Sequence, residues 1–240
     1  MADAASPLPP AGRALRCAAV TGPLEMLEAM ARQEVAVGPN LRHLEVFTTR
    51  GLLTVLWHGA PDAEAAVVLC GGAMGGLLGP ADGLYQWLGE ELTGPGSGIS
   101  VLRVGWRRPN DLDLCTLDLL AAADLASRAG ATRFVTGGHS FGGAVAVRAA
   151  MALGDWARGV VTFATQSAGC EDAGALTAPL RAYHGDRDEL LPLVSSQAVC
   201  ALAGGPAEVV PCAGAGHLLT EAGERLRAEV PAWVRDRFAD

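Results

Sequence analysis

Residues 134–144 read FVTGGHSFGGA, and this stretch decides the fold. Its first residues are apolar and β-branched, which is typical of a buried strand, and the alanine-rich run from Ala144 favours a helix. Ser140 lies between them in a Gly-x-Ser-x-Gly pattern. In a strand-turn-helix setting this pattern strains the backbone at the serine and exposes its Oγ at the end of a sheet. We therefore predict a nucleophile at Ser140, against the alternative of an ordinary glycine-rich turn.

Strands and helices alternate outward from this turn. We expect strands over residues 42–49, 52–57, 65–70, 99–104, 133–136, 159–164, 180–184 and 207–211, and helices over 81–92, 112–129, 141–153, 194–202 and 220–238. The first two strands form an antiparallel hairpin, and the later ones lose their polar face, as strands do when helices cover both sides of a parallel sheet. The sequence thus predicts an α/β fold with about eight strands, mostly parallel.

The first forty residues differ from the rest of the chain. They are rich in Ala and Pro and contain one short candidate helix, residues 23–34. We therefore expect residues 1–40 to form an N-terminal extension packed on a single domain of residues 41–240.

Composition narrows the possible partners. Half of the 240 residues are hydrophobic and 18% are charged, which suits a globule with one large core. The net charge of -8, with no basic run longer than Arg107-Arg108, disfavours nucleic acid and anionic membranes. The longest weakly polar stretch, residues 65–80, contains five glycines and is too short to span a bilayer.

Six cysteines are scattered through the chain: Cys17, Cys70, Cys115, Cys170, Cys200 and Cys212. None forms a CxxC pair, so we expect reduced thiols rather than a disulfide framework or a metal site. The first twenty residues also lack the basic start and continuous apolar segment of a secretory signal. These features predict a cytoplasmic protein without a metal or other cofactor.

A serine hydroxyl needs a general base, and histidine suits that role at neutral pH. The five histidines are His43, His58, His139, His184 and His217. His217 ends the sequence AGAGH in a flexible loop after the last strand, from which a side chain can reach a serine at the carboxyl edge of the sheet. We therefore predict that His217 is the base.

The third member of the site is expected after the preceding strand. Residues 183–192 read YHGDRDELLP and offer three carboxylates in one turn. The acid must accept the second N–H of the imidazole and stabilise the imidazolium. We expect Asp188 to face inward while Asp186 caps backbone amides of the turn. The alternative for either aspartate is a solvated turn carboxylate.

The order Ser140, Asp188, His217 resembles that of the α/β-hydrolases over about residues 40–238, most closely small bacterial dienelactone-hydrolase-like and carboxylesterase-like proteins. The resemblance implies a serine hydrolase that cleaves an ester, lactone or thioester of a small-molecule or acyl-carrying substrate through an acyl-enzyme on Ser140. Amide or peptide cleavage by the same triad and a non-catalytic binding protein remain alternatives. The oligomeric state is not predicted.

The resemblance also implies an oxyanion hole. One donor is the N–H of Phe141, and the other comes from the loop of residues 70–76, CGGAMGG, with Ala73 as first choice and Met74 as second. A phosphate-binding loop is the rival interpretation of these glycines, but no Lys-Ser/Thr pair follows them.

Residues near the carboxyl edge are candidates for substrate binding. Only residues 165–179 separate two strands where many relatives insert a cap, so we expect a cap domain that is absent or minimal. Trp106, Arg107 and Gln166 each follow a strand and are candidate substrate contacts. Arg107 and Arg108 are suited to a substrate carboxylate, and the alternative is a solvated surface pair.

Overall fold

In the computed structural model of this protein, the residues described are 22–239. Cys17 and most of the expected N-terminal extension therefore lie outside the described residues. The five described cysteines are free thiols. No helix within residues 22–239 is long and apolar enough to cross a membrane.

One mixed sheet organises the chain, with strand order β1-β2-β3-β5-β4-β6-β7-β8-β9. The strands are β1 (Ala29–Gly38), β2 (Leu41–Thr48), β3 (Gly51–His58), β4 (Ala65–Cys70), β5 (Ile99–Gly105), β6 (Arg133–His139), β7 (Ala157–Phe163), β8 (Leu180–Gly185) and β9 (Ala207–Cys212). The pairs among β1, β2, β3 and β5 are antiparallel, and the others are parallel. The mostly parallel α/β sheet is confirmed, with nine strands rather than about eight.

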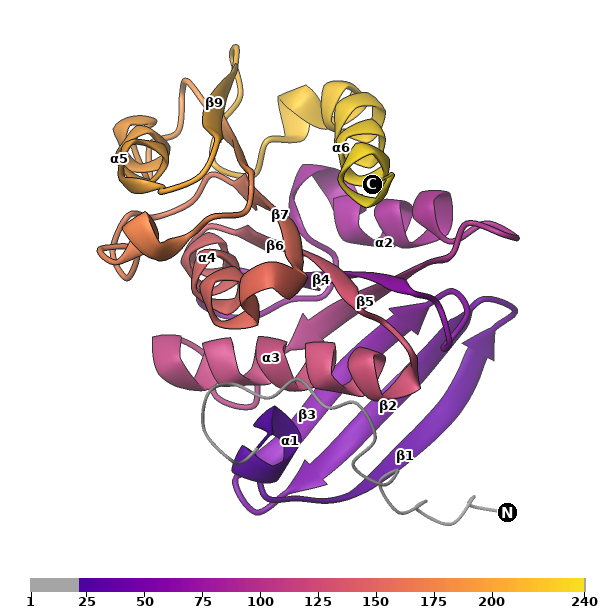
Figure 1. The fold of residues 1–240 in the computed structure, drawn as a ribbon. Helices are drawn as coiled ribbons and strands as arrows, with labels where there is room; N and C mark the ends of the chain where they lie inside the picture. Colours follow the sequence, from indigo (N-terminus) through magenta and orange to yellow (C-terminus); the bar gives the residue numbers. More distant parts are fainter. Residues whose placement is uncertain (1–21, 240) are drawn as a thin grey trace.

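Helices cover both faces of this sheet (Figure 1). They are α1 (Pro23–Met26), α2 (Pro80–Leu92), α3 (Leu112–Ala129), α4 (Phe141–Leu153), α5 (Val194–Leu202) and α6 (Gly223–Phe238). Side chains of α3 and α4 share one hydrophobic cluster, and those of α2 and α6 share the other. Strand β4 alternates between the two clusters, Val68 in one and Val67 and Leu69 in the other, which explains why all six of its residues are buried.

The prediction of a helix over residues 23–34 is wrong. Helix α1 ends at Met26, Glu28 has a left-handed backbone with φ 52°, and β1 then pairs with β2 from Ala29 to Gly38. Backbone hydrogen bonds to the free edge of β2 outweigh the helix propensity of this segment. Residues 29–38 thus belong to the sheet, and a boundary at residue 41 would separate two paired strands.

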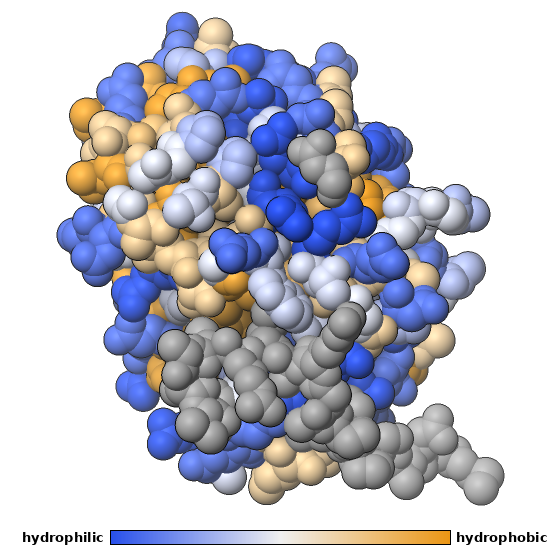
Figure 2. All heavy atoms as spheres, viewed as in Figure 1, coloured by the Kyte–Doolittle hydropathy of each residue, from blue (hydrophilic) through white to orange (hydrophobic). Residues whose placement is uncertain are grey.

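The carboxyl edge of the sheet is open. Between β7 and β8 the chain contains only a single short 3₁₀ turn, η2 (Ala173–Ala175), so no large cap is present there. Figure 2 shows hydrophobic residues gathered on one side of the molecule over the region of α5, where Val194 and Leu202 are 59% and 49% exposed.

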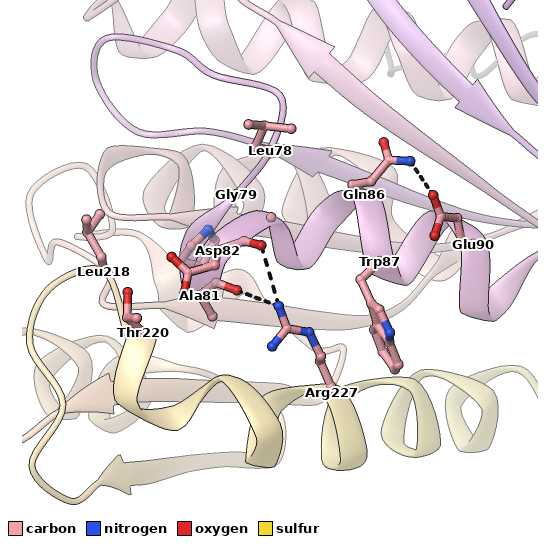
Figure 3. Close-up of a pocket in the computed structure, with 12 residues that line it drawn as sticks. Leu78, Gly79, Ala81, Asp82, Gln86, Trp87, Glu90, Leu218, Thr220 and Arg227 are labelled. Atoms are coloured by element: carbon pink, nitrogen blue, oxygen red, sulfur yellow. Dashed lines mark hydrogen bonds between the residues drawn. The ribbon is translucent and has the colours of Figure 1, made fainter.

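Helix α2 begins with an unusual turn. Ala81, Asp82 and Gly83 have φ values of 51°, 55° and 91°, in the left-handed region, and a right-handed helix follows them. Figure 3 shows this turn lying against α6, where Arg227 Nη2 donates to the carbonyl oxygen of Ala81 at 3.0 Å. Non-glycine residues rarely adopt this conformation, so the surrounding contacts must hold it in place.

Candidate active site

Ser140 forms the whole turn between a strand and a helix. Strand β6 ends at His139, α4 begins at Phe141, and Ser140 has φ 56° and ψ -120°. A Cβ atom on Gly138 would lie 1.9 Å from the carbonyl oxygen of Gly142, and one on Gly142 would lie 2.2 Å from that of Gly71. Only glycine permits these approaches. The predicted strand-turn-helix geometry around Ser140 is therefore present.

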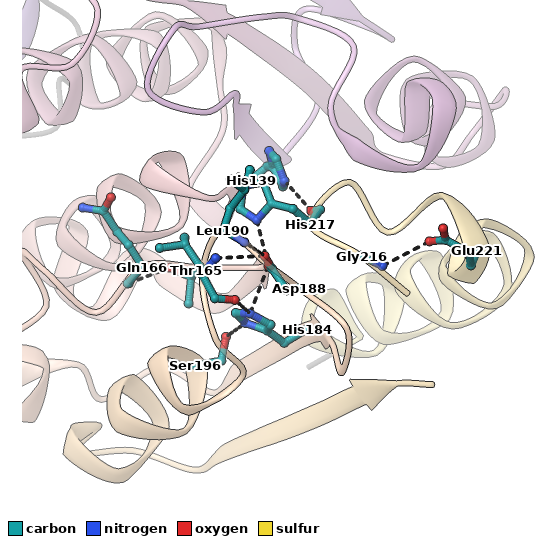
Figure 4. Close-up of polar contacts among 11 residues, drawn as sticks. His139, Thr165, Gln166, His184, Asp188, Leu190, Ser196, Gly216, His217 and Glu221 are labelled. Carbon is teal, nitrogen blue, oxygen red and sulfur yellow. Dashed lines mark hydrogen bonds and ion pairs between the residues drawn. The ribbon is translucent and has the colours of Figure 1, made fainter. Parts of the chain in front are cut away.

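Asp188 and His217 meet in the loops that follow β8 and β9 (Figure 4). Asp188 Oδ2 lies 2.7 Å from His217 Nδ1, while Oδ1 accepts the backbone N–H groups of Leu190 and Leu191, both at 2.9 Å. The Asp188 side chain is fully buried, and that of His217 is 13% exposed. An Nδ1–H that donates to Asp188 leaves His217 Nε2 as the basic nitrogen.

The carboxylate of Asp188 is stabilised as an anion. Burial alone would raise its pKa, but the N–H donors of Leu191, His217 and Leu190 hold the pKa below its ordinary value. Asp188 is therefore ionised at neutral pH and can offset the charge of an imidazolium at His217.

The buried ring of His184 packs against Asp188 and holds the turn that contains it. Its Nδ1 lies 2.6 Å from Ser196 Oγ, and its Nε2 lies 2.9 Å from the carbonyl oxygen of Leu191 and 3.3 Å from Asp188 Oδ2. The ring thus connects β8, α5 and the acid turn. Sequence reasoning considered His184 only as a possible base, and its spacing of four residues from Asp188 was the available signal for a supporting role.

Asp186 and His139 hold the histidine loop. Asp186 Oδ1 accepts the N–H of Gly214 at 2.7 Å, so it caps an amide of the loop after β9 and not, as expected, an amide of its own turn. His139 Nε2 lies 2.9 Å from the carbonyl oxygen of His217. Burial lowers the pKa of His139 to about 4, so its ring is neutral at neutral pH and its Nε2–H can donate to that carbonyl.

Ser140 and His217 line one cavity of about 500 Å³, together with residues 71–79 and Leu218. Ser140 Oγ makes no hydrogen bond to another described residue. In serine hydrolases the bond between nucleophile and base is often long until substrate binds. The cavity therefore brings the predicted nucleophile and base to one space.

The glycine-rich loop after β4 runs directly against the serine. A Cβ atom on Gly72 would lie 3.7 Å from Ser140 Cβ, and the carbonyl oxygen of Gly72 accepts Trp106 Nε1–H and Gly75 N–H, each at 2.9 Å. Ala73 and Met74, the two candidate oxyanion donors, follow in the same loop and line the cavity. Phe141 begins α4, so its N–H has no acceptor within the helix.

The predicted substrate contacts are placed differently. The side chain of Arg107 is 2% exposed and forms an ion pair with the fully buried Asp118, so it is neither a substrate contact nor a surface residue. Trp106 donates its indole N–H to the carbonyl oxygen of Gly72 in the glycine-rich loop, and its contact with substrate stays a prediction. Gln166 donates its side-chain amide to the carbonyl oxygen of Ala168 and does not line the Ser140 cavity. Burial by α3 therefore removes Arg107 from the reach of a ligand.

Solved structures share this architecture at low sequence identity. Est1E from Butyrivibrio proteoclasticus is 15% identical, with a TM-score of 0.69 over 82% of this chain and 99% of that chain. Dienelactone hydrolase from Anabaena variabilis is 17% identical, with a TM-score of 0.66 over 86% and 97%. A monoacylglycerol lipase from Paleococcus ferrophilus is 17% identical, with a TM-score of 0.62 over 77% and 99%.

No protein-family model matches the chain, and no curated protein matches it either. The structural similarity is to nearly the whole length of each of these proteins. The chain therefore has the α/β-hydrolase fold, as the order of its motifs predicts.

Proposed function

We propose that this protein is a serine hydrolase that cleaves a carboxylic ester, lactone or thioester through an acyl-enzyme on Ser140. One observation carries the proposal: His217, paired with Asp188 at 2.7 Å, lines the same cavity as a serine held at φ 56° between strand and helix. The structural neighbours named as an esterase, a dienelactone hydrolase and a lipase support the reaction class.

In the first step Ser140 Oγ attacks the carbonyl carbon of the substrate while His217 Nε2 takes the hydroxyl proton. The π electrons of the carbonyl move to its oxygen and give a tetrahedral oxyanion. The N–H of Phe141 is one donor to this oxygen, and the N–H of Ala73 or Met74 is the other. Ionised Asp188 stabilises the imidazolium that forms on His217.

The tetrahedral species then collapses. The carbonyl re-forms, the bond to the leaving alcohol or thiol breaks, and His217 gives its proton to the leaving group. An acyl ester on Ser140 remains. A water molecule, deprotonated by His217, attacks the acyl carbon. When this second tetrahedral species collapses, the bond to Ser140 Oγ breaks, His217 returns the proton to Oγ, and the acid is released.

Labelling with a fluorophosphonate probe followed by peptide mapping tests this proposal. We expect the label on Ser140 in the parent, and no label there in Ser140→Ala or His217→Ala, because the second variant lacks the base. Ser167→Ala replaces an exposed serine nearby and is the matched control, which should label like the parent. An unlabelled parent, or a label on a different serine, would overturn the proposal.

A further inference from the structure

A second cavity, of about 530 Å³, adjoins the cavity that contains Ser140 (Figure 3). Leu78, Gly79 and Leu218 line both cavities, so the two spaces meet at these residues. Leu78 and Leu218 are 62% and 61% exposed. Two large apolar side chains therefore stand in the open where the cavities join, one from the loop before α2 and one beside His217.

The wall of the second cavity is held firmly. It includes the left-handed turn of Ala81, Asp82 and Gly83. The N–H of Ala81 donates to the carbonyl oxygen of Leu218 at 2.8 Å, and Arg227 holds the carbonyl oxygen of Ala81 from α6. The first of these bonds connects the cavity wall to the loop that contains His217, and the second connects it to α6. Strained backbone that its surroundings hold in this way is concentrated at ligand sites.

The side chains in the second cavity suit an uncharged ligand. Trp87 supplies an aromatic surface, while Asp82 and Glu90 are carboxylates. Arg227 is the only arginine or lysine among the described lining residues of the two cavities, and it already donates to the Ala81 carbonyl. Asp82 and Glu90 repel a negative charge, and Arg227 already donates to the Ala81 carbonyl. The cavity therefore disfavours a ligand whose chain ends in an anion. A carboxylate-bearing substrate would therefore find no free cation there.

We propose that the second cavity binds the aliphatic chain of an uncharged ester whose carbonyl lies at Ser140. The chain passes between Leu78 and Leu218 and ends against Trp87. This inference rests on the proposed hydrolase function for its substrate class, and it adds that chain length and charge are selected outside the Ser140 cavity.

The first experiment measures kcat/KM for p-nitrophenyl esters from butanoate to octanoate, and for alkyl acetates of the same range. A fully buried methylene contributes about 0.8 kcal/mol, or about fourfold, and a half-open cavity about half of that free energy. We therefore expect about twofold per methylene in one series, which identifies the acyl or the alcohol side. No rise in either series would overturn the proposal.

Variants locate the preference. Trp87→Ala and Leu78→Ser should each bring the eight-carbon to four-carbon ratio of kcat/KM, measured in the series that rises in the parent, to within about threefold of unity. Leu202→Ser is the matched control, because Leu202 is an exposed leucine on α5 that lines neither cavity, and it should keep the parent ratio. A parent ratio in both Trp87→Ala and Leu78→Ser would contradict the proposed position of the chain.

A charged substrate tests the electrostatic part. The mono-p-nitrophenyl ester of adipic acid has the chain of the hexanoate ester with a carboxylate at its end. We expect kcat/KM for the hexanoate ester to be at least tenfold higher. Faster cleavage of the adipate half ester would show that the cavity selects an anion and would overturn the proposal.

Ligand binding separates this proposal from the proposed function. 2-Undecanone has a carbonyl and a long chain but no bond to hydrolyse, so calorimetry reports its affinity whether or not Ser140 is a nucleophile. We expect it to bind at least tenfold more tightly than 2-heptanone, and to lose this advantage in Trp87→Ala. If 2-undecanone binds in this way but no ester is cleaved, the proposed hydrolase function is wrong and the proposed role of the second cavity is supported. Ester turnover with equal affinity for both ketones would do the reverse.

Discussion

Two buried carboxylates, Asp118 and Asp188, show how the same burial serves two purposes. Both side chains are fully buried; Asp118 pairs with Arg107, and Asp188 pairs with His217 and also lies 3.3 Å from His184. Arg107 is itself buried at 2% exposure and does not line the Ser140 cavity, so the Asp118 pair is structural. His217 is 13% exposed, borders a cavity and can exchange a proton.

The donors around each carboxylate also differ. Burial raises the pKa of Asp118, although Arg107 opposes this effect, whereas the amides of Leu191 and Leu190, with His217, lower the pKa of Asp188 despite burial. The structural pair still serves the site, because it fixes the segment after β5 from which Trp106 donates to the glycine-rich loop. Burial alone therefore does not identify a catalytic acid. The basic side chain that the carboxylate contacts distinguishes the two.

The largest effect should come from Asp188→Asn. The amide favours the wrong tautomer of His217 and cannot offset its positive charge, a defect that costs on the order of 10⁴ in kcat in serine hydrolases. The measurement is kcat on an activated ester, with circular dichroism as the check on folding. A folded Asp188→Asn protein within tenfold of the parent would remove the distinction between the two carboxylates.

Asp118→Asn should act on stability instead. The amide nitrogen of asparagine would face one of the buried N–H groups of Arg107 that now donate to Asp118, and a buried donor without an acceptor costs about 1 to 3 kcal/mol of unfolding free energy. Urea denaturation measures this loss, and kcat per folded molecule should stay within about tenfold of the parent. The distinction between the two carboxylates would be wrong if Asp118→Asn had the unfolding free energy of the parent but lost as much kcat as Asp188→Asn.

Asp186→Asn should have a smaller effect. Asp186 accepts the Gly214 amide, and an asparagine oxygen can do the same, so we expect kcat/KM within about tenfold of the parent, or roughly 1.4 kcal/mol in barrier height. Both mutants, Asp186→Asn and Asp188→Asn, are assayed on one activated ester. If Asp186→Asn is the crippled variant, Asp186 is the residue that orients His217.

The smallest expected effect is a difference in pH dependence. A lowered carboxylate pKa, as at Asp188, adds stability above the unfolded pKa that is lost as pH falls through the folded pKa. A raised pKa, as at Asp118, adds stability at low pH that is lost as pH rises through the folded pKa.

Unfolding free energies of the parent and both variants, Asp188→Asn and Asp118→Asn, measured between about pH 3 and pH 7, test this difference. On acidification the advantage of the parent over Asp188→Asn should shrink, and its advantage over Asp118→Asn should grow. Slopes of the same sign would mean that the two carboxylates titrate alike.

Local patterns made part of this molecule predictable. The turn at Ser140 depends on glycines next to it in the sequence, and Asp188 and His217 lie in loops directly after predicted strands, so chain order was enough to bring them to one edge. The helices α3, α4 and α5 begin and end at the expected residues, because their hydrophobic periodicity is continuous.

Long-range packing made the rest unpredictable. Residues 29–38 have helix-favouring side chains, and only pairing with β2 makes them a strand. The pair of Arg107 and Asp118 depends on how α3 folds back over the strand edge. The second cavity joins residues near Leu78 with residues near Leu218, and the left-handed turn between them has no sequence signature other than Gly83.

The most direct test of the account is the mass of the protein after brief mixing with p-nitrophenyl butanoate and acid quench. We predict that a fraction of the parent gains one butanoyl group and that the acylated peptide contains Ser140. Ser140→Ala should gain none. A parent that releases p-nitrophenol in a reaction dependent on His217 but never carries an acyl group at Ser140, or carries it on another residue, would contradict the account.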